Sequence, residues 1–137
     1  MQVALKLLSG VVACSVFILL ARRMGVGREL WLYSVALVIA ALIYLVFAAR
    51  GASLSWLALE LAGLAVFTIL AWLGLKISAW ILAFGWAAHA AWDAILHKLT
   101  DADFVPAWYP LVCLGFDLLL AGYIVARTRR NAFERAA

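Results

Sequence analysis

Five ionisable side chains lie inside or at the edges of strongly apolar runs of this sequence, namely Glu60, His89, Asp93, His97 and Asp117. A charge at the centre of a membrane costs roughly 2.5–3.5 kcal/mol on insertion scales, so acids placed there indicate a site in the interior of a helix bundle. Acid/base catalysis is the first chemistry that the set predicts. We expect Glu60 or Asp117 to donate the proton. His89 and Asp93, four residues apart on one helical face, would form the relay.

Aromatic and sulfur side chains accompany the acids and are candidates for binding a hydrophobic substrate. Trp86 and Trp92 offer ring faces that can stabilise a cationic intermediate. Trp56 precedes Glu60 by four residues, and the same spacing joins Tyr109, Cys113 and Asp117, so each set shares a helical face. We expect a lipid- or isoprenoid-like molecule to enter this site sideways from the membrane. The alternative readings are an inert buried thiol for Cys113 and, for Trp56 as for the other tryptophans near the helix ends, an interfacial belt.

Two other kinds of site fit the same residues. His89, Asp93 and Glu60 could hold a metal ion. His97 lies eight residues, about 12 Å, from His89 and could not share that ion. The acids and histidines could instead neutralise one another as interhelical hydrogen bonds in a non-catalytic assembly subunit, with a homo-oligomer as one form of it. The sequence assigns no cofactor.

The elements that must position these groups follow from composition. The chain has 137 residues, of which 69% are apolar and 13% charged, and its mean hydropathy is +1.11. A soluble domain is about 45–50% apolar and about 25% charged. These values exclude a soluble globular enzyme, a disordered chain and a nucleic-acid binder. A membrane-spanning helix needs roughly 20 residues. The sequence therefore predicts an all-α, single-domain integral membrane bundle over residues 1–137, with five transmembrane helices at about 3–21, 30–49, 54–75, 77–96 and 107–126.

The basic residues predict the orientation of this bundle, because Lys and Arg concentrate on the cytoplasmic side. One face would carry Lys6, Arg50 and Lys98. The other would carry eight basic residues: Arg22, Arg23, Arg28, Lys76, Arg127, Arg129, Arg130 and Arg135. We therefore expect the N-terminus outside and the C-terminus in the cytoplasm, with Asp101 and Asp103 in an outer loop. The polar set then falls in the outer half, and the inner half offers nothing comparable.

Two segments of the sequence contain motifs that resemble those of a known family. Residues 85–97 contain His-Ala-x-Trp-Asp-x-x-x-His, and residues 108–117 read Trp-Tyr-Pro-x-x-Cys-x-x-Phe-Asp. This half of the chain resembles a family of small bacterial multi-pass membrane proteins without assigned function. The resemblance implies a bacterial inner-membrane protein and marks His89, Asp93, His97 and Asp117, but it implies no reaction. In architecture alone, without a shared motif, the chain is similar to small membrane isomerases and cyclases of sterols and terpenoids, which slightly favours lipid chemistry.

Overall fold

The computed structural model describes residues 1–98, 102–130 and 133, so Asp101 and Arg135 lie outside the described residues. Five α-helices and one π-helical segment follow in chain order: α1 (Gln2–Arg22), α2 (Val26–Ala49), α3 (Leu54–Lys76), α4 (Ala79–Trp92), η1 (Asp93–Lys98) and α5 (Tyr109–Arg129). With η1 counted as the continuation of α4, all five are long and apolar enough to cross a membrane. The described residues form no strand. The prediction of an all-α bundle with five transmembrane helices is confirmed.

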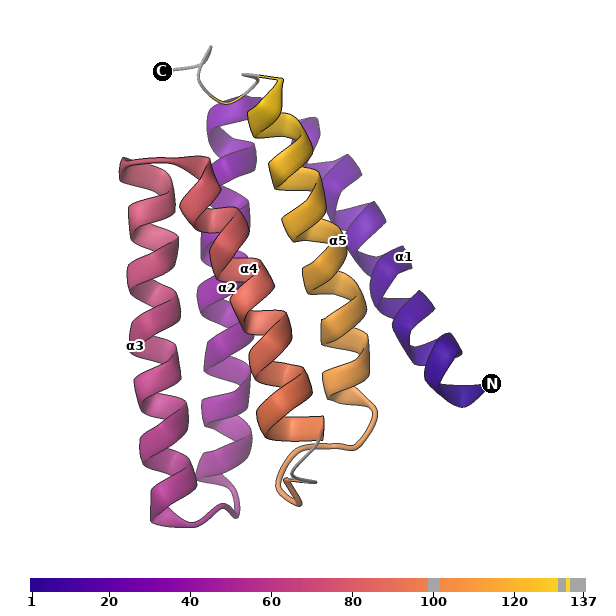
Figure 1. Cartoon of the computed structure of the whole chain (residues 1–137), viewed down its shortest axis with the longest axis vertical. Helices are drawn as coiled ribbons and strands as arrows, with labels where there is room; N and C mark the ends of the chain where they lie inside the picture. The colour runs from indigo at the N-terminus through magenta and orange to yellow at the C-terminus, as the bar shows by residue number, and fades with distance from the viewer. Residues whose placement is uncertain (99–101, 131–132, 134–137) are drawn as a thin grey trace.

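Consecutive helices run in opposite directions (Figure 1). The N-terminus, the α2–α3 turn and residues 102–108 before α5 lie at one end, which we term the N-terminal end. The α1–α2 turn, the α3–α4 turn and residue 130 lie at the other, the C-terminal end. Seryl caps fix two of the helix starts, because the hydroxyls of Ser53 and Ser78 accept hydrogen bonds from the backbone of Trp56 and Trp80.

The helices differ from the predicted spans in two ways that affect polar residues, one in where a helix begins and one in how a helix is wound. Helix α2 begins at Val26, four residues earlier than the apolar run, because Gly25 adopts a positive φ of 89° and completes the turn from α1. The longer helix takes Glu29 into the bundle. The fourth span changes its winding at Asp93, where the five-residue hydrogen-bonding step of a π-helix replaces the α-helical step.

Helix α4 lies at the centre of the bundle, in contact with α2, α3 and α5, whereas α1 packs chiefly against α5. The indole of the buried Trp86 donates a hydrogen bond to the carbonyl oxygen of Tyr33 at 3.2 Å, which joins α4 to α2. The central helix therefore presents its polar residues to three neighbours at once, and the π segment keeps both Asp93 and His97 buried.

Candidate functional site

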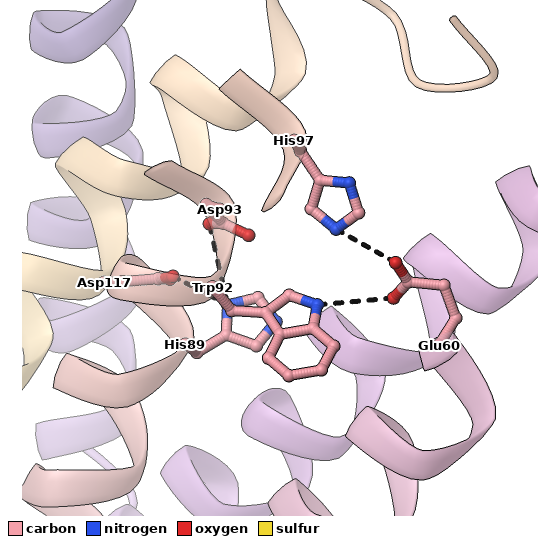
Figure 2. Close-up of polar contacts among 6 residues, drawn as sticks. All are labelled: Glu60, His89, Trp92, Asp93, His97 and Asp117. Atoms are coloured by element: carbon pink, nitrogen blue, oxygen red, sulfur yellow. Dashed lines mark hydrogen bonds and ion pairs between the residues drawn. The ribbon is translucent and has the colours of Figure 1, made fainter. Parts of the chain in front are cut away.

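Three buried side chains from α4, η1 and α5 form the first cluster, which we term the His89 triad: His89, Asp93 and Asp117. The Nδ1 atom of His89 lies 2.8 Å from Asp117 Oδ2 and 3.6 Å from Asp93 Oδ2 (Figure 2). One ligand atom from each residue lies within 4.8 Å of the others. The predicted relay pair of His89 and Asp93 is thus in contact, and Asp117 joins it from α5.

Glu60 belongs to a second cluster, the Glu60 pair, which it forms with His97. Their Oε1 and Nε2 atoms lie 3.1 Å apart, and the Trp92 indole is 3.4 Å from the other carboxylate oxygen of Glu60 (Figure 2). Gly63 makes room for this indole, since a Cβ at Gly63 would lie only 2.8 Å from the Trp92 ring. The candidate metal set of His89, Asp93 and Glu60 is therefore not assembled. Asp117 takes the place expected for Glu60.

Tyr44 of α2 joins the two clusters and was not foreseen from the sequence. Its ring stacks on the His97 ring with centroids 4.0 Å apart and planes inclined by 8°. Its buried hydroxyl lies near the Asp93 carboxylate and the Cys113 thiol. A hydroxyl deep within an apolar run was the available signal.

The predicted substrate-binding residues fall into two groups. Trp56 lies beside the Glu60 pair, with its ring centroid 6.1 Å from that of His97. Tyr109 makes an edge contact with Tyr44 at 5.5 Å, and Trp86 lies 5.8 Å from Phe116.

The second group lines a pocket of about 310 Å³ between α2 and α5. Its walls are almost wholly apolar and include the half-exposed Ile39, so the pocket opens on the lipid-facing surface of the bundle. Asp117 is the acid among its lining residues, which are Ala36, Ile39, Ala40, Ile43, Trp86, Tyr109, Val112, Cys113, Phe116 and Asp117. The triad therefore borders an apolar pocket at Asp117.

The C-terminal end holds a third polar cluster, the Glu29 cluster. The expectation that buried polar groups occur only in the half of the bundle toward the N-terminal end is therefore wrong. Glu29 is 1% exposed and accepts hydrogen bonds from the hydroxyls of Tyr33 at 3.1 Å and Tyr123 at 2.8 Å. Arg127 donates to its second oxygen at 2.9 Å. The spacing of Glu29 and Tyr33, four residues apart, was the signal in the sequence.

Comparison with known proteins identifies a family for the chain but indicates no activity. A family model described as a family of unknown function, DUF6010, matches residues 5–130. No curated protein and no solved structure matches the chain.

Proposed function

The chain belongs to DUF6010, a family of unknown function, and we propose from its own geometry that it binds a lipid- or isoprenoid-like molecule and transforms it by acid/base chemistry. One observation carries this proposal. Asp117 both lines the apolar pocket between α2 and α5 and contacts His89 at 2.8 Å. A hydrophobic molecule in the pocket would therefore meet an acid whose proton can pass to an imidazole.

The roles follow from the contacts. Asp117 exchanges the proton with the bound molecule, His89 accepts or returns it, and Asp93 stabilises the imidazolium that forms. Glu60 acts through His97 and Trp92, which both contact it, and positions the π segment that carries Asp93. Trp86, Tyr109 and Cys113 line the binding pocket. A purely structural role competes with this proposal, because direct pairing of acids and histidines also stabilises helix packing.

Filling the pocket tests this proposal. Farnesol, an isoprenoid alcohol, is the probe, and the melting temperature of the detergent-purified protein is the measurement. We expect farnesol to raise the melting temperature of the wild type, because a ligand that binds the folded state stabilises it. The Ala40→Phe change places a ring in the pocket and should abolish the rise. Ala65→Phe, on an exposed position of α3, is the matched control and should keep it.

The outcomes separate the competing roles. An equal rise for Ala40→Phe and the wild type would remove the pocket from the proposal. A wild type that shows no rise, and that releases no stoichiometric lipid to mass spectrometry after purification, would support the structural role instead.

We also propose a bacterial inner-membrane location with the N-terminus outside and the C-terminus in the cytoplasm, on the basis of eight basic residues against three. A C-terminal green fluorescent protein fusion should then fluoresce in bacterial cells, whereas a C-terminal alkaline phosphatase fusion should be inactive. The same fusions after Arg50, in the α2–α3 turn, should give the opposite pattern. Active phosphatase at the C-terminus would reverse the orientation and place the His89 triad in the cytoplasmic half.

A further inference from the structure

We propose that the His89 triad is a binding site for a single divalent transition-metal ion, with His89, Asp93 and Asp117 as its protein ligands. This inference deepens the proposed function and rests on it only for the neighbouring pocket. Metal binding itself can be measured without any organic ligand.

The geometry of the triad suits one ion. Three atoms no more than 4.8 Å apart lie within about 2.8 Å (4.8/√3) of a common centre. Bonds from zinc to imidazole nitrogen or carboxylate oxygen are about 2.0–2.2 Å long. Movements of less than about 1 Å per ligand, within the reach of side-chain rotation, would therefore complete the site.

The charge of the triad favours a bound cation. Asp93 is 0% exposed, and among the described residues neither of its carboxylate oxygens has a hydrogen-bond partner. Two carboxylates face one imidazole, so with both acids ionised the triad carries one net negative charge even if His89 is protonated. Burying an uncompensated charge is strongly unfavourable. A divalent ion would balance both carboxylates and leave His89 neutral, the form in which imidazole binds metals.

The ligand types indicate which ions fit. An imidazole nitrogen with carboxylate oxygens suits Zn²⁺, Mn²⁺ or Fe²⁺, whereas Ca²⁺ and Mg²⁺ prefer oxygen ligands alone. Three protein ligands leave coordination positions open, which is the arrangement of catalytic rather than structural zinc sites. Since Asp117 also lines the apolar pocket, such an ion would lie beside the pocket. There it would act as a Lewis acid toward the bound molecule. With Asp117 ionised as a ligand, a water molecule on the ion would take over the proton exchange assigned to Asp117 above.

The test measures metal content directly. The protein is purified in detergent without a polyhistidine tag, stripped with chelator, incubated with Zn²⁺ or Mn²⁺, freed of excess ion and analysed by inductively coupled plasma mass spectrometry. We expect one ion per wild-type chain. Asp93→Asn and Asp117→Asn should each weaken binding at least about tenfold, because each removes a charged ligand.

Glu29→Gln is the matched control, since it alters a buried carboxylate in the Glu29 cluster, which shares no residue with the triad. It should retain one ion per chain. The inference is overturned if the wild type binds neither metal, if Asp93→Asn binds as well as the wild type, or if folded Glu29→Gln loses the ion.

A variant that fails to fold is recognised by aggregation on size-exclusion chromatography. In that case Asp93→Glu, which keeps the charge and lengthens the side chain, should bind measurably more ion than Asp93→Gln, and equal binding would overturn the inference. A wild type that binds farnesol but no metal would remove the ion and leave the proposed function standing. A wild type that binds metal but no farnesol would support the metal site and contradict the proposed function.

Discussion

Glu29→Ala should lower the free energy of unfolding by about 3 kcal/mol, since removing one partner of a buried ion pair typically costs about 3–5 kcal/mol and Arg127 here keeps some contact with solvent. The change leaves the Arg127 guanidinium and the hydroxyls of Tyr33 and Tyr123 without their shared acceptor. Unfolding of the purified protein by titration with sodium dodecyl sulfate measures the loss.

Graded variants identify the cause of this effect. Tyr123→Phe removes one hydrogen bond and should cost about 0.6–1.5 kcal/mol. Glu29→Gln keeps the acceptor oxygen but loses the charge, so its cost should lie between those of Tyr123→Phe and Glu29→Ala. If Glu29→Ala proved as stable as the wild type, the Glu29 cluster would contribute nothing to the fold.

The position of the Glu29 cluster gives it a second consequence. It joins α2 to α5, and the apolar pocket lies between the same two helices. The cluster fixes the spacing of these helices at the C-terminal end, while Tyr44 and Tyr109 contact each other across the same interface toward the N-terminal end. The pocket thus lies between two fixed points, and its width depends in part on the Glu29 cluster, whose residues do not line it.

The sequence was sufficient to predict the five helices because membrane spans depend on length and hydropathy, and both are local properties. The contact between His89 and Asp93 was also predictable, since residues four apart on a helix must lie on the same face. In both cases the relevant interaction is contained within one segment of chain.

Which polar side chains on different helices contact each other could not be predicted from the sequence. Glu60 contacts His97 and not His89 because the rotation of α3 about its axis, together with the π-helical turn at Asp93, decides which polar residues meet. Neither is encoded in spacing along one helix. Glu29 could not be assigned to the bundle for another reason, because the apolar run starts after it and the helix starts before it.

Substituting the glycines at the contact between α1 and α5 should have the other large effect. Gly10 and Gly115 bring the two backbones together, and a Cβ at Gly10 would lie 2.0 Å from the carbonyl oxygen of Val112. A Cβ at Gly115 would lie 2.3 Å from the carbonyl oxygen of Leu7. Backbone atoms cannot rotate away as side chains do, so Gly115→Ala should force the helices apart at a cost of about 1–3 kcal/mol or more.

The thiol of Cys14 reports this separation, because Cys14 lies on α1 and is 0% exposed in the closed bundle. In a Cys113→Ala background, Gly115→Ala and Gly10→Ala should each increase the rate of Cys14 alkylation by N-ethylmaleimide about tenfold, the factor that 1.4 kcal/mol of easier opening gives. Gly122→Ala is the matched control on α5, since a Cβ there meets no atom within 4 Å. Cys14 protection in Gly115→Ala equal to that in Gly122→Ala would show that α1 is not held by this contact. Because Gly115 lies two residues from Asp117, faster labelling together with an unchanged metal content would further show that the His89 triad keeps its geometry while α1 moves away from α5.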